Sequence, residues 1–279
     1  MTLALLLEPF HYDYMLKAIG ASALVGAACA FLSAYLMLKG WSLMGDALSH
    51  SVVPGVAGAY ALGLPYAAGA FLTGMLAALA MTLIRQFTRL REDAIIGFVF
   101  STFFAVGLLI ISLNPTSIDV QSVIFGNILG IADEDIVQVL IIIAVTFAVL
   151  LLIWKDLLLC FFDEAHAVTI GLSPLRLKLI FFTLLSACTV AALQTVGAIL
   201  VIAMVITPGA TAYLLTDRFP RLVLIAVLIG GLSGGVGAWL SYFVNGATGG
   251  VIVTLQTLIF LAAFGFAPKY GVVWRKGSK

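Results

Sequence analysis

Charged residues are scarce in this sequence, and their scarcity excludes most classes of soluble protein. Only 10% of the 279 residues are Asp, Glu, Lys or Arg, whereas 63% are hydrophobic and the mean hydropathy is +1.19. A chain of this length and composition could not stay dissolved as a globular domain, so we predict a polytopic membrane protein. The formal net charge of +1 also provides no clustered basic face of the kind that nucleic-acid binding requires.

Cysteines are few, and nucleotide-binding motifs are absent from the sequence. The three cysteines, Cys29, Cys160 and Cys188, lie far apart in mostly apolar stretches. They therefore predict neither a disulfide framework nor a CxxC metal site, and we expect inert apolar residues. The pattern GxxxxGK[ST] does not occur, and no set of nucleophile, base and orienting residue stands out. We expect one transmembrane domain over residues 1–279 that is not itself an enzyme; any ATP would be hydrolysed by another chain.

Long apolar runs divide the chain into membrane spans. A bilayer crossing needs about 20 apolar residues, so the longest runs must be split at their polar or Gly/Pro breaks, at 63–65, 194–197 and 245–250. We predict an all-α polytopic transmembrane helical bundle of about nine spans, with eight and ten as alternatives. The expected spans lie near residues 14–38, 42–63, 65–84, 94–113, 136–154, 179–195, 197–215, 222–243 and 251–267.

The distribution of Lys and Arg predicts the orientation of the chain. With nine spans and the N-terminus outside, every basic residue except Lys17 falls on the cytoplasmic side, as the positive-inside rule requires. The outer side then carries acidic residues, which would attract cations. The basic residues predicted on the inner side are Lys39, Arg85, Arg89, Arg91, Lys155, Arg176, Lys178, Arg218, Arg221, Lys269, Arg275, Lys276 and Lys279.

An ionisable pair lies inside the second predicted span. Asp46 and His50 are four residues apart, which places them on one face of a helix, one turn from each other. Ionisable side chains cost roughly 2.5–3.5 kcal/mol inside a bilayer and are functional candidates there. A carboxylate and an imidazole suit manganese, iron(II) or zinc, and the missing thiolate argues against copper(I). Two donors are too few for a site, but two chains paired about an axis would supply four.

A structural alternative for the same pair stays open. Asp46 can cap the start of the helix while His50 hydrogen-bonds a carbonyl or the carboxylate itself. The two interpretations are compatible.

Three separated motifs resemble one family. They occur in the order GDALSHSVVPG (residues 45–55), FGNILG (residues 125–130), and VGAILV with TPGATA (residues 196–201 and 207–212). The match runs from about Tyr14 to about Pro268. The chain resembles the permeases of bacterial metal-uptake ABC transporters for manganese, zinc and iron(II), and in detail the chelated iron and manganese permeases of enteric bacteria.

This resemblance implies roles for residues and partners. It implies that Asp46 and His50 coordinate the passing ion. It also implies that residues 119–135, which read as a short amphipathic helix at the outer surface, lie beneath a solute-binding protein that delivers the ion. A packed outer loop with an acidic turn at 133–135 is the alternative.

The third motif region contains polar residues and a proline in an uncharged stretch. Pro208 removes one backbone hydrogen bond and loosens the helix there, and broken helices often line a translocation path. We therefore regard Gln194 and Thr207 as candidate pore-lining residues. A tolerated kink, satisfied by Thr207, is the alternative.

The inner loop over residues 155–178 contains a short predicted helix. Asp163 is a candidate N-cap, Gly171 a C-terminal stop, and Pro174 prevents continuation. A helix of about two turns needs a surface to dock against. The resemblance implies that it is the coupling helix for the ATPase, with Asp163, Glu164, Ala165 and Gly171 as its residues; the Glu-Ala-Ala…Gly pattern of importer permeases is matched only in part. A self-contained interfacial turn is the alternative.

Two further features favour structural roles. Gly230 with Gly234, and Gly231 with Gly235, form small-xxx-small pairs that let helices approach closely, within the chain or at a subunit interface. Trp41 lies near a predicted span end, where an interfacial aromatic anchor is expected.

Together these observations predict a permease of an ATP-driven importer in a bacterial inner membrane. It would carry manganese, iron(II) or zinc inward by alternating access, with no permanently bound cofactor. The expected partners are a cytoplasmic ATP-binding subunit, a second permease chain that is identical or related, an external metal-binding protein and membrane lipid. An ion-coupled secondary carrier, in which Asp46 titrates, is the alternative, and an assembly or regulatory subunit is a third; the few intramembrane charges favour the ABC importer.

Overall fold

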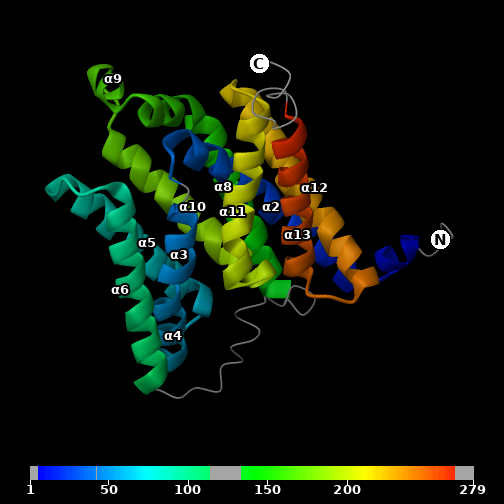
Figure 1. Ribbon diagram of the computed structural model, residues 1–279. Coiled ribbons are helices and arrows are strands. Elements are labelled where there is room, and N and C mark those ends of the chain that lie inside the picture. Colours follow the sequence, from blue (N-terminus) through cyan, green and yellow to red (C-terminus); the bar gives the residue numbers. More distant parts are fainter. Residues whose placement is uncertain (1–5, 42, 114–132, 268–279) are drawn as a thin grey trace.

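The computed structural model describes residues 6–41, 43–113 and 133–267, and every regular element in these ranges is a helix (Figure 1). The predicted all-α transmembrane class is thereby confirmed. Elements keep the labels of Figure 1. They are η1 (Glu8–His11), α2 (Asp13–Lys39), α3 (Met44–Ser51), α4 (Val53–Leu62), α5 (Tyr66–Phe87), α6 (Glu92–Leu113), α8 (Asp133–Phe162), α9 (Glu164–Thr169), α10 (Pro174–Val196), α11 (Ala198–Leu215), α12 (Phe219–Val244) and α13 (Thr248–Phe266).

Seven described helices are long and apolar enough to cross a membrane: α2, α5, α6, α8, α10, α12 and α13. Helix α11 contributes a shorter apolar stretch at Val201–Leu215, and α3 and α4 follow each other with only Val52 between them. Helices thus occupy all nine expected ranges, although α8 continues past Trp154 to Phe162. The number of bilayer crossings stays a prediction.

Helix α2 lies at the centre of the bundle. Tyr35 is fully buried, and its hydroxyl donates a hydrogen bond to the backbone carbonyl of Trp154 in α8 at 3.2 Å. Its ring packs against Phe161, Phe181 and Phe219, with centroid distances of 6.0, 6.0 and 4.8 Å. One side chain of α2 therefore joins α8, α10 and α12.

Small residues bring α2 and α12 into close contact. A Cβ atom added at Gly26 would lie 2.3 Å from the carbonyl oxygen of Gly230, and one added at Gly234 would lie 2.3 Å from that of Ser22. The pair Gly231 and Gly235 faces Ala23 at ordinary van der Waals distances. The glycine pairs of α12 thus serve packing within the chain, one of the two roles that the sequence left open.

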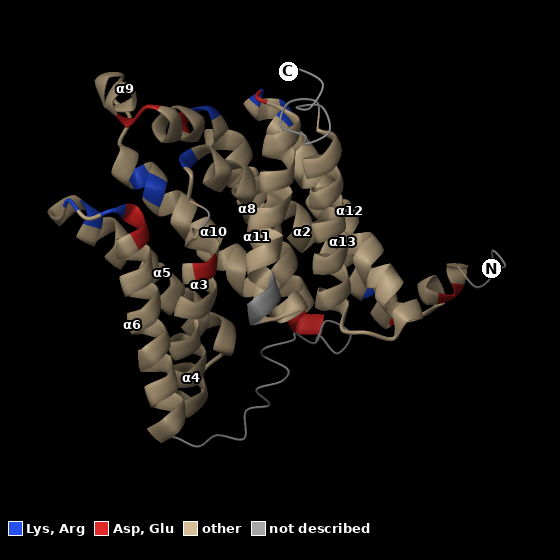
Figure 2. Ribbon diagram, viewed as in Figure 1, with Lys and Arg blue, Asp and Glu red and all other residues tan. Residues whose placement is uncertain are grey.

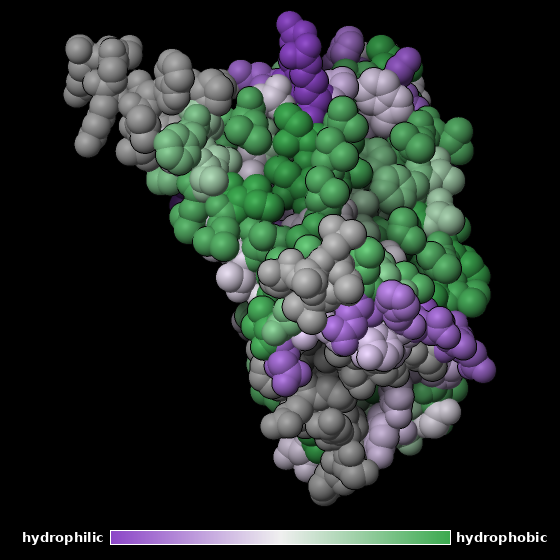
Figure 3. Space-filling model, turned by 90° about the vertical axis from the view of Figure 1, so that its right-hand side faces the viewer, coloured by the Kyte–Doolittle hydropathy of each residue, from purple (hydrophilic) through white to green (hydrophobic). Residues whose placement is uncertain are grey.

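Charged residues collect at the two ends of the bundle. Figure 2 shows Lys and Arg gathered mainly toward the upper side of the bundle. They lie near the starts of α10 and α12, in the C-terminal part of α8 and at the α5–α6 connection. At the lower end, Lys17 of α2 forms an ion pair with Asp133 of α8. On the face drawn in Figure 3, a broad hydrophobic region separates two hydrophilic ones. This is the surface expected of a protein embedded in lipid.

Some predicted features lie outside the described residues. They are FGNILG at 125–130, the predicted outer helix over 119–135 up to residue 132, and the basic residues from Lys269 onward.

Candidate functional site

Helix α3 lies inside the helix bundle. It contacts α5, α6, α10 and α11. The glycine at its first turn makes this possible, because a Cβ atom at Gly45 would already lie 3.0 Å from Cγ1 of Val205 in α11. Hydroxyl groups inside α3 are satisfied by the helix itself: Ser49 donates to the carbonyl of Gly45 at 2.7 Å, and Ser51 to that of Ala47 at 2.6 Å.

The two predicted metal ligands meet on α3. Nε2 of His50 lies 3.3 Å from Oδ1 of Asp46, and their side chains are 24% and 38% exposed in the single chain. The predicted shared helix face is therefore present. Figure 2 shows the acidic colour on α3 part-way along the bundle, below the charged α5–α6 connection. Among the described residues, no group of three or more His, Cys, Asp or Glu is close enough to hold a metal.

The capping alternative for Asp46 is wrong. The N-cap of α3 is Leu43, and no side chain caps that position. Asp46 is the third residue of the helix and points to His50, one turn further along. The remaining part of the structural alternative, a hydrogen bond between the two side chains, is compatible with the observed distance.

Two phenylalanines that the sequence reasoning missed lie against His50. The centroids of Phe100 and Phe104, both in α6, are 5.2 and 5.4 Å from the imidazole centroid, at interplanar angles of 64° and 76°. The only signal in the sequence is their spacing of one helical turn, which does not distinguish them from lipid-facing residues of the same helix.

The candidate pore-lining residues have contacts of their own. The side-chain amide of Gln194, in α10, lies 3.4 Å from Oδ1 of Asp135 in α8, and its oxygen is buried without a hydrogen-bond partner in the described part of the chain. The backbone carbonyl of Thr207, in α11, accepts a hydrogen bond from the Thr211 hydroxyl at 2.7 Å. That either residue lines a path stays a prediction.

Helix α11 continues through Pro208, and the polar contacts there come from Ser33 of α2. The Ser33 hydroxyl donates to the carbonyl of Ile206 and accepts from the amide of Gly209, each at 3.1 Å. Gly209 is required for this approach, because a Cβ atom would lie 2.3 Å from that hydroxyl. The side chain that contacts the backbone on both sides of Pro208 is thus a serine 173 residues before Ile206, and spacing could not reveal it.

The end of the bundle where most Lys and Arg residues gather carries the short helix predicted between α8 and α10. Oδ1 of Asp163 accepts a hydrogen bond from the amide of His166 at 2.9 Å, which confirms the N-cap. Gly171 follows with φ +86°, a left-handed conformation that glycine adopts without strain, and α10 begins at Pro174. The side chains of Val168 and Ile170 are 57% and 56% exposed. Helix α9 therefore presents an apolar surface at a charged end of the bundle.

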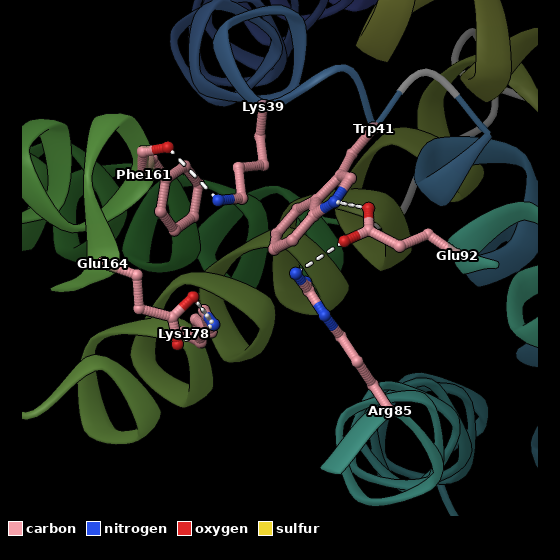
Figure 4. A network of polar contacts seen from close by, with 7 residues as sticks. All are labelled: Lys39, Trp41, Arg85, Glu92, Phe161, Glu164 and Lys178. Atoms are coloured by element: carbon pink, nitrogen blue, oxygen red, sulfur yellow. Dashed lines mark hydrogen bonds and ion pairs between the residues drawn. The ribbon is translucent and has the colours of Figure 1, made fainter. Parts of the chain in front are cut away.

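A network of polar contacts lies beside α9, and we call it the inner network after its predicted side of the membrane. It is made of Lys39, Trp41, Arg85, Glu92, Phe161, Glu164 and Lys178 (Figure 4). Nζ of Lys178 lies 2.6 Å from both carboxylate oxygens of Glu164. Burial raises the pKa of the Glu164 carboxyl, but the hydrogen bonds and charge of Lys178 outweigh burial, so the pKa lies below its ordinary value. Lys39 donates to the carbonyl of Phe161 at 3.3 Å.

Trp41 belongs to the inner network, and its burial corrects its predicted role as an interfacial anchor. Its side chain is buried, at 4% exposure, and Nε1 donates to Oε2 of Glu92 at 2.5 Å. Oε1 of Glu92 pairs with Arg85 at 2.6 Å, and the guanidinium lies 5.7 Å from the indole centroid. The indole also stacks on Phe182 of α10, with centroids 5.4 Å apart. A cavity of about 490 Å³ lies between these residues and α9.

Comparisons with known proteins place this geometry in a family. The profile of the ABC 3 transport family matches residues 11–267. The chain is 79% identical over 271 residues to the chelated iron transport system membrane protein YfeC of Yersinia pestis, covering 97% of this chain and 92% of that one. It is 50% identical to the manganese transport system membrane protein MntB of a Synechocystis strain, covering 98% and 90%.

Solved structures share the fold. PsaBC from Streptococcus pneumoniae, in complex with Fab, superimposes with a TM-score of 0.87 at 33% identity, covering 99% of this chain and all of that one. An inward-facing metal-chelate type ABC transporter reaches a TM-score of 0.70 at 18% identity, covering 90% and 84%, and this second likeness concerns the fold alone.

Proposed function

The chain belongs to the ABC 3 transport family, and on this premise we propose that it is the permease subunit of an ATP-driven importer of divalent transition metals. The cargo is manganese or iron(II), with zinc as a further candidate. The names of the similar iron and manganese transport proteins support this choice.

The observation that carries the proposal is the Asp46–His50 pair. A carboxylate oxygen and an imidazole nitrogen 3.3 Å apart, on a helix surrounded by other helices, present two adjacent donors that borderline divalent ions accept. Both side chains remain partly exposed in the single chain, so an ion can reach them.

A second permease chain completes the site in this proposal. Two donors from each of two chains give four ligands around one ion, with room for water. The exposed fractions of Asp46 and His50 leave a side of the pair open for such a partner. The partner is an identical or a related chain.

Energy enters through α9. Its N-cap, its ion pair with α10 and its exposed apolar residues fit a docking helix set against a cytoplasmic ATP-binding subunit. Asp163, Glu164, Ala165 and Gly171 form this coupling element. ATP hydrolysis on the partner would then alternately open the outer and inner ends of the permease pair.

The charge distribution supports the orientation. The end with α9 and the start of α12, which carries Arg218 and Arg221, faces the cytoplasm of a bacterial cell. The end with Lys17 and Asp133 faces outward, where a metal-binding protein delivers the ion. In this proposal the N-terminus lies outside and the C-terminus inside.

Uptake measurements test the proposal. Labelled manganese, iron(II) and zinc are offered to metal-starved cells that carry the whole system, with wild type compared to Asp46→Asn at matched membrane levels. Asn keeps the size of the side chain and removes its charge, so we expect uptake to be lost while the complex still assembles.

Unimpaired uptake in Asp46→Asn would contradict the ion path through α3. Uptake that survives an inactive ATPase but stops with a protonophore would instead indicate a secondary carrier.

A further inference from the structure

We propose that Phe100 and Phe104 of α6 are positioning residues that set the ion selectivity of the Asp46–His50 pair. They form an apolar wall, defined by these two rings, that fixes the imidazole and disfavours ions that hold their hydration water tightly. This inference rests on the proposed function and deepens it.

The wall consists of two rings one helical turn apart. Phe100 and Phe104 lie nearly parallel, with centroids 6.0 Å apart and an interplanar angle of 14°. Each presents a tilted contact to the same imidazole, at 5.2 and 5.4 Å. Aromatic rings at such separations attract each other by about 0.5–1.5 kcal/mol beyond area burial. The pair therefore restricts the orientations available to the His50 ring while its Nε2 points to Asp46.

Helix α6 is held firmly in this position. A Cβ atom added at Gly107 would lie 2.8 Å from Cγ1 of Val53 and 2.9 Å from the backbone nitrogen of Pro54, so α6 touches the α3–α4 junction directly. The neighbouring turns carry Phe100 and Phe104. Because α6 rests on the start of α4, the helix cannot carry the two rings away from His50 without breaking this contact.

The wall offers no ligand to an ion. Phenyl rings have no lone pairs, so an ion beside His50 can gain neither a protein oxygen nor a stable water from that direction. Magnesium dehydrates reluctantly and prefers oxygen ligands in strict octahedral geometry. Manganese, iron(II) and zinc accept an imidazole nitrogen that offsets the lost water. The wall therefore disfavours magnesium relative to the transition metals.

Transport kinetics test the wall in the full complex. Phe100→Ala/Phe104→Ala is compared with Phe98→Ala, a matched control on the same helix whose side chain is 64% exposed. The readouts are KM and maximal rate for labelled manganese, and the magnesium concentration that halves uptake. For the double variant we expect a KM increase of roughly tenfold, the lower end of what loss of a supporting contact costs a metal site, and inhibition by about tenfold less magnesium. Phe98→Ala should change neither.

Conservative variants keep the test decisive if the double alanine variant does not assemble. Phe104→Tyr keeps the ring and adds an oxygen to the wall, so magnesium should inhibit more strongly with the fold intact. Phe100→Leu/Phe104→Leu keeps an apolar wall and should retain the rejection of magnesium.

Unchanged KM and unchanged magnesium inhibition in the alanine and tyrosine variants would contradict the proposal that the two rings set ion selectivity. If Asp46→Asn abolishes uptake while these variants behave as wild type, only the wall fails. If Asp46→Asn transports normally, the proposed function itself fails.

Discussion

The Asp46–His50 pair and the inner network both contain carboxylate side chains, but the carboxylate oxygens have different numbers of polar partners in the two regions. In the inner network, each oxygen of Glu92 has its own partner, Trp41 or Arg85, and both oxygens of Glu164 contact Lys178. For Asp46, the described residues show one partner, His50, at the longer distance of 3.3 Å.

This difference indicates different purposes. A polar group whose atoms are all paired contributes to stability, and removing one partner leaves the other unsatisfied. A pair that is incompletely satisfied inside a membrane costs free energy, so its retention points to a ligand that completes it. This contrast favours a structural role for the inner network and supports the proposed binding role of the α3 pair.

Replacing one carboxylate by its amide in each region should give the largest difference between loss of uptake and loss of stability. Asp46→Asn should abolish metal uptake while the melting temperature of the purified complex stays unchanged or rises. Glu92→Gln should leave the KM for manganese unchanged and destabilise the protein by about 1 kcal/mol, since the Arg85 and Glu92 side chains are about one third exposed. For a chain of this size that lowers Tm by roughly 2–4 °C.

A reversed pattern, in which Glu92→Gln blocks uptake at constant stability, would remove the distinction between the two regions. Gln keeps an acceptor for Trp41, so the variant isolates the ion pair with Arg85.

A smaller effect is expected at the end of α9. Gly171→Val forces a β-branched residue into a left-handed conformation, which costs roughly 1–3 kcal/mol locally. The C-terminal stop of α9, the proposed docking helix, should distort, so co-purification of the ATPase subunit and metal-stimulated ATP hydrolysis should both fall. Gly40→Val, at φ +75° on the end of α2, is the matched control for strain alone. Equal losses in both variants would argue against docking through α9.

The smallest effect is a pH dependence of the Glu164–Lys178 ion pair. The pKa of Glu164 is lowered from 4.5, so the stabilising contribution is complete above about pH 4.5 and is lost as the pH falls through the lowered pKa. Glu164→Gln lacks this contribution. The difference in Tm between wild type and variant should therefore be present at pH 7, shrink below pH 4.5, and correspond to under about 1 kcal/mol because the carboxylate is 42% exposed. A constant difference across this range would show that the ion pair is not its source.

Local patterns in the sequence were sufficient for much of the molecule. Apolar run length and Gly/Pro breaks placed the helices, the spacing of Asp46 and His50 placed both on one face, and Asp163 and Gly171 marked the ends of α9. Each of these depends on neighbouring residues in the chain.

The remaining features depend on contacts between distant segments. Trp41 lies beside a predicted span end, and only the positions of Arg85, Glu92 and Phe182 make it a buried residue. The Ser33 hydroxyl in α2 donates a hydrogen bond to the carbonyl of Ile206 in α11, 173 residues further along the chain. In a sequence that is 63% hydrophobic, the phenylalanines that face His50 look the same as those that face lipid.

Trp41 also gives this protein a built-in optical reporter. Its indole lies between a cation, a carboxylate and two phenylalanine rings, so its fluorescence depends on the distances to Arg85 and Glu92. With Trp154, Trp239 and Trp274 replaced by Phe, the remaining emission would come from this one position, three residues before α3. Opening of the inner end during turnover could then be followed in real time, without an attached dye.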